Sequence, residues 1–394
     1  MFSRARYEHL CRALHFADNV DRPTNDADRL FCLSPVLDHL NSRFKSVYIP
    51  SQNVCIDESL TLWKGNLSFR QFIKTKAARF GIKTFELCES STGYLWSFFV
   101  YTGSSTKYDS TLPTNIQKTT ATVLSLIRPL LENGYTLFMD NLFNSPLLAR
   151  YLKAHKTDCV GTLRPNRRNV PPLVALAKMK EGEFIARHSG DMTVLAYADK
   201  KRKITTLSTY HGNSQGLMPS KPHRPAQFKP TVILDYNIGM GGVDRKDQML
   251  EPYLLERKKC AKWNRKLFKR LLNCSILNSR ILFNSSSGSF REHIAFRLDL
   301  VGSILENHLN HIPKPTSYHF LNRPTSGGFT NSGSNHAPIL NPTLEVNGRR
   351  GRRRCYYCIE KHKRRATIYL CSTCQIPLCV APCFRLYHAF QSHS

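Results

Sequence analysis

The stretch NVCIDESLTLW, residues 53–63, opens the part of the chain that decides the fold. Two similar runs follow it, IKTFELCES at residues 82–90 and YLWSFFVYTG at residues 94–103. All three show the strand-like alternation of apolar and polar side chains, and Gly81 and a turn at residues 91–93 separate them. Strands joined by short turns pair in opposite directions, so we expect an antiparallel meander of three strands.

The segment after this meander alternates helices and strands. We expect a helix in ATVLSLIRPLLENG at 121–134, a strand in YTLFMD at 135–140, a helix from Ser145 with Pro146 at its first position, and a strand in DCVGTL at 158–163. Three meandering strands followed by helix, strand, helix and strand is the order of a ribonuclease-H-like core. The sequence therefore predicts an α/β fold of that class.

The rest of the chain flanks or interrupts this core. Strand-like runs at 184–198 and 203–210 predict an inserted β-rich subdomain, and TVILDYN at 231–237 predicts a further strand. Apolar spacing before residue 50 and from about residue 258 to 283 predicts helices. The expected domains are a helical domain at 1–53 and 252–312, the core at 54–165 and 227–251, the insertion at 166–226, a flexible linker at 313–348 and a cysteine-rich zinc-finger domain at 349–394.

Six of the thirteen cysteines lie in the last forty residues, followed by two histidines. Intracellular thiols stay reduced and paired C-x-x-C steps suit a tetrahedral ion, so zinc explains this spacing better than disulfides do. Eight ligands would hold two zinc ions. If ligand pairs alternate between ions, as in cross-braced fingers, Cys355, Cys358, Cys379 and Cys383 share one ion and Cys371, Cys374, His388 and His393 share the other. The alternative, unligated buried cysteines, is disfavoured because so short a module has little apolar surface with which to fold unaided.

The composition points to a polyanionic partner. Lys and Arg number 57 against 28 Asp and Glu, a formal charge of +29, so nucleic acid is the first candidate. No apolar run approaches the roughly twenty residues of a membrane span, and the first residues lack the apolar core of a secretory signal. We expect an intracellular protein with no membrane and no small-molecule substrate.

Four aspartates lie in or next to strands and helices that the predicted fold brings together. Two-metal phosphoryl chemistry requires carboxylates that converge on hard cations such as Mg²⁺ or Mn²⁺. Asp57 lies in the first meander strand and Asp140 ends the strand YTLFMD, and these strands are neighbours in a ribonuclease-H-like sheet. Asp244 and Asp247 lie one turn apart on a helix after the turn GMGG. Taken singly, each aspartate is as well explained by a turn or a helix cap, and only the joint pattern favours a metal site.

The residues resemble the piggyBac transposase family, specifically the piggyBac transposable-element-derived proteins. The likeness is carried by CIDESLTLWKG, FGIKTFEL, FMDNLFNSPLLARYL, DYNIGMGGVDRKDQM and the terminal CYYC, CSTC and PLCVAPCFRLYH. It implies a DDD catalytic core in which Asp57, Asp140 and Asp244 hold Mg²⁺ and Asp247 is the accessory aspartate. The implied reaction is cleavage at transposon ends, hairpin formation by the freed 3′ hydroxyl, and strand transfer into TTAA targets.

The same resemblance implies that residues 1–53 and 252–312 form a helical dimerisation and DNA-binding domain, that the protein is a homodimer, and that the finger recognises DNA near transposon ends. Members of the family usually carry an acidic N-terminal region and more of the helical domain before the point where this chain begins. End binding and dimer assembly are therefore left open by the resemblance.

Basic residues cluster in three segments that we expect to contact DNA phosphates, although a charge run is more often a solvated face. They are Lys74, Lys76, Arg79 and Lys83 between the first strands, Lys258, Lys262, Arg265, Lys266 and Lys269 on the late helix, and Arg352, Arg353 and Arg354 before the finger. The arginine cluster also has the composition of a nuclear localisation signal, so a nuclear location is expected.

Three functions are compatible with these patterns. The first is a transposase or a domesticated derivative that cuts and joins DNA with its aspartate triad. The second is a catalytically silent DNA-binding or chromatin protein that keeps the fold. The third, a ubiquitin-ligase module of the RING type, is opposed by the polybasic flank of the finger and by the rest of the chain.

Overall fold

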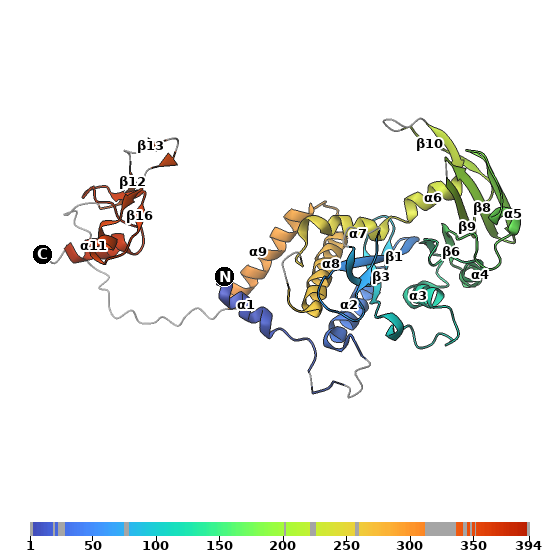
Figure 1. Ribbon diagram of the computed structural model, residues 1–394, viewed down its shortest axis with the longest axis horizontal. Coiled ribbons are helices and arrows are strands. Elements are labelled where there is room, and N and C mark those ends of the chain that lie inside the picture. Colours follow the sequence, from blue (N-terminus) through green and yellow to red (C-terminus); the bar gives the residue numbers. More distant parts are fainter. Residues whose placement is uncertain are drawn as a thin grey trace. The chain divides into compact units, whose positions relative to one another are not determined.

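The computed structural model describes residues 3–18, 20–22, 28–74, 79–200, 202–220, 226–256, 260–311, 336–341, 345–346, 349–350 and 352–391. The chain divides into two compact units, Met1–Leu309 and Asn310–Ser394, whose elements are labelled in Figure 1. In the part of the chain that the structure describes, no helix combines the length and apolar character needed to span a membrane.

The first unit consists of a β-sheet and the helices around it. Its helices are α1 (Arg4–Ala13), α2 (Ser34–Ser46), α3 (Lys118–Ile127), α4 (Pro146–Ala154), α5 (Pro172–Ala175), α6 (Thr231–Gly239), α7 (Gly242–Leu250), α8 (Trp263–Ser286) and α9 (His293–His311), with 3-10 turns η1 (Phe31–Leu33), η2 (Gly103–Ser105), η3 (Arg128–Leu130) and η4 (Glu251–Tyr253). Its strands are β1 (Asn53–Leu62), β2 (Gln71–Phe72), β3 (Phe80–Glu89), β4 (Leu95–Val100), β5 (Thr136–Met139), β6 (Asp158–Thr162), β7 (Phe184–Ser189), β8 (Met192–Asp199), β9 (Arg202–Ser208), β10 (Gln215–Met218) and β11 (Gln227–Pro230).

Nine of these strands form one mixed sheet in the order β2-β3-β1-β5-β6-β9-β8-β7, with β4 paired to β3. The neighbours β1, β3 and β4 are antiparallel, which confirms the predicted meander. Strand β5 runs parallel to β1, and β6 runs parallel to β5. The predicted succession of helix, strand, helix and strand after the meander is also confirmed, because α3, β5, α4 and β6 follow β4 in that order.

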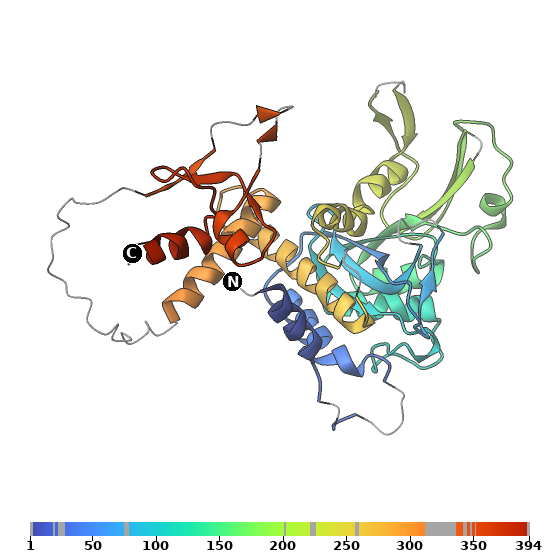
Figure 2. The same ribbon diagram turned by 60° about the vertical axis from the view of Figure 1, so that its left-hand side comes forward.

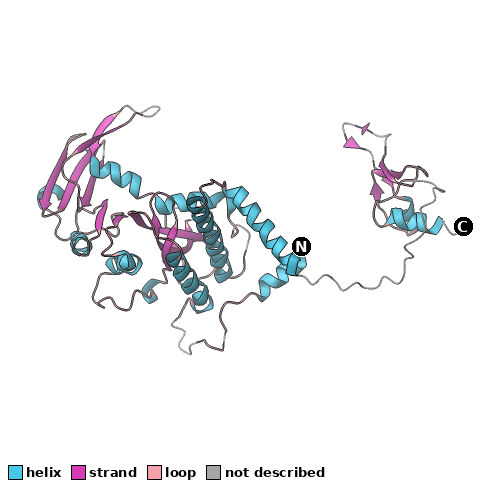
Figure 3. Cartoon of the chain, turned by 180° about the vertical axis from the view of Figure 1, so that it is seen from behind, coloured by secondary structure: helices cyan, strands magenta, loops and turns pink. Residues whose placement is uncertain are grey.

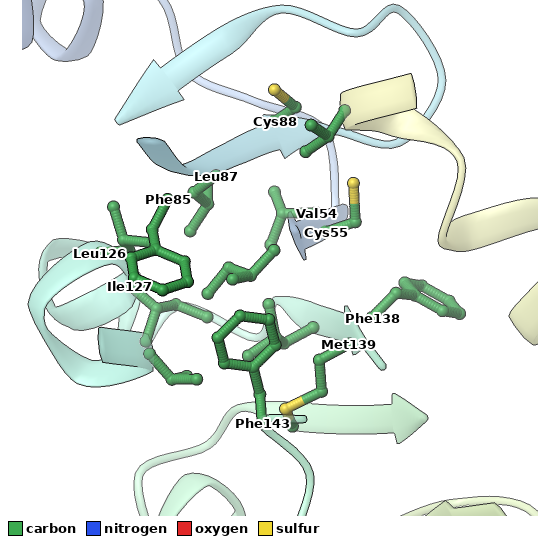
Figure 4. Close-up of a cluster of buried hydrophobic side chains, with 14 of the residues drawn as sticks. Val54, Cys55, Phe85, Leu87, Cys88, Leu126, Ile127, Phe138, Met139 and Phe143 are labelled. Atoms are coloured by element: carbon green, nitrogen blue, oxygen red, sulfur yellow. The ribbon is translucent and has the colours of Figure 1, made fainter. Parts of the chain in front are cut away.

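One part of the core of the first unit lies between this sheet and α3. Figure 4 shows Phe85 of β3 with Leu126 and Ile127 of α3, and Phe143 beside them; all four side chains are buried. Cys55 of β1 projects to the other face of the sheet, where it meets α7. Because side chains alternate along a strand, that second face of β1 also carries the side chains of Asp57 and Ser59.

Two asparagine side chains cover the free edge of β4. Asn41 of α2 donates to the carbonyl of Phe98 (2.8 Å) and accepts from its amide (2.9 Å). Asn278 of α8 makes the same pair of hydrogen bonds with Leu95, at 2.8 and 3.0 Å. An amide side chain that reproduces strand pairing satisfies exposed backbone groups and protects the edge from other chains. Figure 3 shows these helices beside the strands of the sheet.

The predicted strand at residues 231–237 is wrong, because these residues belong to helix α6. The apolar run TVIL is too short to distinguish a strand from a helix by its periodicity. In the structure Val232 and Ile233 are buried, and Gly239 approaches the ring of Phe138 so closely that a Cβ would lie 2.4 Å from it. The spacing of these buried positions is that of one helical face.

Residues 166–226 extend the sheet and do not stand apart from it. Strand β9 pairs antiparallel with β6, with Gly161 opposite Leu207, and β8 and β7 continue outward from β9. The hairpin of β10 and β11 forms a separate two-stranded sheet, which Figure 2 shows next to α6. The predicted strands at 184–198 and 203–210 are confirmed, and the bounds of the inserted domain stay a prediction.

The second unit is a small module of short elements. They are β12 (Pro338–Leu340), β13 (Glu345–Val346), β14 (Arg349–Arg350), β15 (Arg353–Arg354), α10 (Tyr356–Glu360), β16 (Ala366–Thr367), β17 (Tyr369–Cys371) and α11 (Cys383–Gln391). Strand β12 pairs with β17, so Ile339 lies opposite Leu370. Residues 338–340, which we expected in the flexible linker, are therefore part of the folded module.

Candidate functional site

The first two predicted aspartates each follow a paired residue of two neighbouring strands. Strands β1 and β5 are parallel, and Ile56 opposite Met139, the last pair of their register, directly precedes Asp57 and Asp140. In-register neighbours of parallel strands project from the same face. Both carboxylates act on the phenol of Tyr236 in α6, whose pKa is raised to about 12 mainly by burial and further by these two negative charges.

Asp140 is held in a tight turn directly after β5. Its Oδ1 accepts a hydrogen bond from the amide of Leu142 at 2.8 Å, and its carbonyl accepts from Asn144 at 3.1 Å. Burial raises the pKa of Asp140, and the hydrogen bond from Leu142 only partly opposes this effect. A carboxylate whose charge is costly in this way is stabilised by a cation, which fits a role as a metal ligand.

Asp244 reaches the same face of the sheet from the first turn of α7. The start of this helix packs directly on β1: a Cβ on Gly242 would lie 2.7 Å from Cys55 Sγ and from the carbonyl oxygen of Glu89. Only glycine permits this approach. Cys55 precedes Asp57 by two residues and therefore shares its face of β1. Asp244 is exposed, beside the buried face of α7 that Val243 and Lys246 form.

The three aspartates do not form a group of ligand atoms within 4.8 Å of one another. Among the described residues, groups of three or more Cys, His, Asp or Glu ligand atoms within 4.8 Å of one another occur only in the second unit. A pair of ions about 4 Å apart has its carboxylates distributed over both ions, so such a site does not need three carboxylates around one point. Carboxylate oxygens are the donors that Mg²⁺ and Mn²⁺ prefer, and the residues fit these ions by donor type.

Asp247 has a different environment from the other three. Its carboxylate binds Lys246 Nζ at 2.9 Å and Arg270 Nη2 at 2.5 Å, and it accepts from Ser59 Oγ at 2.9 Å. Burial alone would raise the pKa of Asp247, but Lys246 and then Arg270 outweigh burial and lower it. Burial likewise opposes the charge of Lys246, yet Asp247 and Glu86 hold the pKa of Lys246 above its ordinary value.

Sequence reasoning missed two arginines that lie beside Asp140. Arg164 Nε donates to Asn141 Oδ1 at 3.1 Å, and Arg167 Nη2 donates to the carbonyl of Leu142. Both come from the loop RPNRR directly after β6, the strand next to β5. A basic run at the end of a strand that neighbours a candidate aspartate was the signal that could have found them.

The expected DNA contacts differ in their exposure. Those that are exposed are Lys74, Arg79, Lys262, Arg352, Arg353 and Arg354; Lys269 is half-buried, and Lys76 and Lys258 lie outside the described residues. Lys83 lies 4.4 Å from the centre of the Phe85 ring, and Arg265 donates to the carbonyl of Arg12. Lys266 is only 8% exposed, so the prediction that it lies on an exposed basic face of α8 is wrong. The reason is that α8 is covered on more than one side, and Arg270 is buried as deeply as Lys266.

The second unit contains two groups of ligand atoms, each within 4.8 Å of one another. One consists of Cys355, Cys358, Cys379 and Cys383, and the other of His336, Cys371, Cys374 and His388. In the first group Cys358 Sγ and Cys383 Sγ are 3.4 Å apart. In the second group His336 Nδ1 is 3.1 Å from Cys374 Sγ, and His388 Nε2 is 3.6 Å from the same sulfur. A tetrahedral zinc ion holds its ligands roughly 3.3 to 3.8 Å apart, so these residues fit zinc.

Hydrogen bonds orient the ligands of both groups. His388 Nδ1 donates to the carbonyl of Phe384 at 2.8 Å, which turns its Nε2 toward Cys374. The amide of Cys379 donates to Cys355 Sγ at 3.3 Å, an interaction that stabilises a thiolate. His393 lies outside the described residues. His336 was missed because it stands in a stretch whose Ser, Gly and Asn content predicts a linker.

Two family models match the chain. The model described as Transposase IS4 matches residues 1–280, and the DDE_Tnp_1-like zinc finger matches residues 331–389. The second match includes His336 and all six cysteines of the two groups, and it ends before His393.

Known proteins and a solved structure are similar over nearly the whole chain. PiggyBac transposable element-derived protein 3 of Homo sapiens is 27% identical over 98% of the chain, and the chimeric ERCC6-PGBD3 protein of Homo sapiens is 27% identical over the same share. The chain spans 63% and 35% of their lengths, less than two thirds of either. The cryo-EM structure of the piggyBac transposase synaptic complex with hairpin DNA matches 96% of this chain and 78% of its own, with 25% identity and a TM-score of 0.70. The Transposase IS4 model covers more than half of the chain, so the chain belongs to that transposase family, and its resemblance to piggyBac transposases and their derived proteins is confirmed.

Proposed function

We propose that this chain cuts and joins double-stranded DNA as a piggyBac-type transposase or its domesticated derivative, with Asp57, Asp140 and Asp244 holding Mg²⁺ or Mn²⁺ and TTAA as the target sequence. The observation that carries the proposal is the register of β1 and β5, in which Ile56 and Met139, the residues directly before Asp57 and Asp140, lie opposite each other. The similar solved structure, a piggyBac transposase complex with hairpin DNA, supports DNA as the partner.

The residues of the chain act here by binding and orientation. Divalent ions at such carboxylates activate a water or a 3′ hydroxyl and stabilise the leaving oxygen. Asp57 and Asp140 supply oxygen ligands from a rigid sheet, and Asp244 adds a third from the start of α7. Arg164 is held beside Asp140 by Asn141, where its guanidinium is placed to bind a DNA phosphate. Water and DNA hydroxyls are the nucleophiles, so no side chain forms a bond to the substrate.

The variant Asp140→Asn tests this function. The amide keeps the shape and the hydrogen bond from Leu142 but loses the negative charge, so we expect Mg²⁺-dependent nicking of DNA with a TTAA junction to fall on the order of a hundredfold or more. The matched control is Asp191→Asn, which makes the same change in the exposed turn between β7 and β8.

Nicking and strand transfer are measured on linear and hairpin DNA with Mg²⁺ or Mn²⁺. Equal nicking by wild type and Asp140→Asn contradicts the proposed catalytic site. Salt-sensitive binding of the same DNA without any nicking by the wild-type chain favours the silent DNA-binding alternative instead.

A further inference from the structure

Five ionisable side chains form a chain of alternating charge next to the candidate active site; four are buried, and the Asp247 side chain is 28% exposed. The exposed fractions of Lys246, Glu86, Arg270 and Glu256 are 0%, 5%, 8% and 5%. Lys246 binds Glu86 and Asp247, and Arg270 binds Asp247 and, at 3.3 Å, Glu256. Buried charges are costly unless their partners are held in good geometry. Each group is therefore tightly oriented by its neighbours.

This charge chain joins four elements at one place. Glu86 on β3 lies directly opposite Asp57 on β1 in the antiparallel register. Ser59, two residues beyond Asp57 on the same face of β1, donates to both oxygens of Asp247, at 2.9 and 3.1 Å. Arg270 brings α8 to the same carboxylate. Asp247 thus fastens α7 to β1 and α8 one helical turn away from Asp244.

We infer that Asp247 is a positioning residue and not a metal ligand: its carboxylate, held by Lys246, Arg270 and Ser59, sets the rotation of α7 and so directs Asp244 toward Asp57 and Asp140. This inference rests on the proposed function, because it assigns the metal to the other three aspartates. Two cations already contact Asp247, and they repel a divalent ion that approaches the same carboxylate.

A comparison of Asp247→Asn with Asp247→Ala distinguishes a positioning role of residue 247 from a role as a metal ligand. Asparagine at position 247 keeps an oxygen that accepts from Ser59, Lys246 and Arg270. It leaves two carboxylates facing two cations in place of three, so the net charge of the group changes by one unit and becomes neutral. Alanine removes the acceptor altogether. A positioning role therefore tolerates asparagine much better than alanine, whereas a metal ligand loses its function with either.

The test is the binding of Mn²⁺ to the full chain with zinc present. Binding is measured from the electron paramagnetic resonance signal of the Mn²⁺ that stays free in solution. We expect Asp57→Asn and Asp244→Asn to weaken Mn²⁺ binding about tenfold or more, because each removes a direct ligand. Asp247→Ala and Arg270→Gln should weaken it about tenfold, because they release the contacts that orient Asp244. Asp247→Asn stays within about threefold of wild type because its hydrogen bonds are kept. Asp244→Asn and Asp247→Asn are the matched pair of this test, because they make the same chemical change one turn apart on α7.

Any one of several results overturns the inference. Equal losses in Asp247→Asn and Asp247→Ala identify Asp247 as a ligand, and unchanged binding in Arg270→Gln removes the role of α8. If Arg270→Gln does not fold, Ser59→Ala replaces it, since it removes only a hydroxyl donor; unchanged Mn²⁺ affinity in that variant overturns the inference as well. If Asp57→Asn binds Mn²⁺ as tightly as wild type, both the proposed function and this inference are contradicted. If Asp57→Asn weakens Mn²⁺ binding but every Asp247 variant binds like wild type, only this inference is contradicted.

Discussion

At the scale of single residues, one histidine from outside the predicted cysteine-rich domain completes the second group of Cys and His ligand atoms. His336 lies 35 residues before Cys371, yet its Nδ1 is 3.1 Å from Cys371 Sγ and equally close to Cys374 Sγ. Pairing of β12 with β17 brings it there, because Pro338 lies opposite Cys371. The histidine that sequence spacing suggested, His393, is outside the described residues and outside the matched zinc-finger family.

Zinc content distinguishes the two histidines. We expect the full chain to bind two zinc ions, His336→Ala to retain one, and His393→Ala to retain two, because only a lost ligand opens a tetrahedral site. Zinc per chain is measured by atomic emission after exhaustive dialysis. One zinc ion in His393→Ala and two in His336→Ala would restore the ligand set expected from spacing.

At the scale of elements, the sequence predicted what depends on local pattern and missed what depends on long-range pairing. Strand β1, which carries Asp57, and strand β5, which directly precedes Asp140, were found because each is a long or strongly apolar run next to a clear turn. Helix α6 was mistaken for a strand because TVIL fits both periods, and its helical state depends on packing of Gly239 against Phe138. The pairing of β9 with β6 and of β12 with β17 joins segments whose register no local pattern encodes.

The start of α9 contains a histidine that makes stability depend on pH. The ring of His293 meets the ring of Tyr253 edge to face, with ring centres 4.4 Å apart, and His293 accepts a hydrogen bond from Arg297 at 3.0 Å. Burial, and then the charges of Arg297 and Arg280, lower the pKa of His293 from 6.5 to about 4. The folded state thus favours neutral His293, so its contribution to stability is present above pH 6.5 and is lost as the pH falls toward about 4.

The variant His293→Gln tests this dependence. Between about pH 7.5 and about pH 5 we expect the wild-type free energy of unfolding to fall by roughly 1 kcal/mol more than that of His293→Gln, after allowance for partial exposure. Urea unfolding is followed by tryptophan fluorescence, which reports the first unit alone because Trp63, Trp96 and Trp263 all lie in it. The control is His308→Gln, an exposed histidine of the same helix; an equal effect of both variants contradicts the role of His293.

At the scale of the whole molecule, a charge of +29 opposes the homodimer that the family resemblance implies. Two such chains repel each other, and salt shortens the range of that repulsion to about 10 Å at 0.1 M. An attractive surface must therefore act at close range. Helix α9 offers one: Ile294, Leu298, Val301 and Leu305 are 46%, 64%, 54% and 43% exposed, with the four-three-four spacing of a coiled-coil seam.

We propose that this stripe of α9 pairs with a second copy of the chain, and that the dimer therefore forms more readily as salt increases. Light scattering at increasing ionic strength should show the wild-type mass rising from 45.1 kDa toward twice that value, because screening weakens repulsion but leaves apolar burial intact. Leu298→Glu, which places a charge in the stripe, should stay monomeric. Ser303→Glu adds the same charge to an exposed position away from the stripe and should dimerise like wild type. A dimer that survives Leu298→Glu, or one that dissociates as salt is added, shows that contacts other than the α9 stripe hold the two copies together.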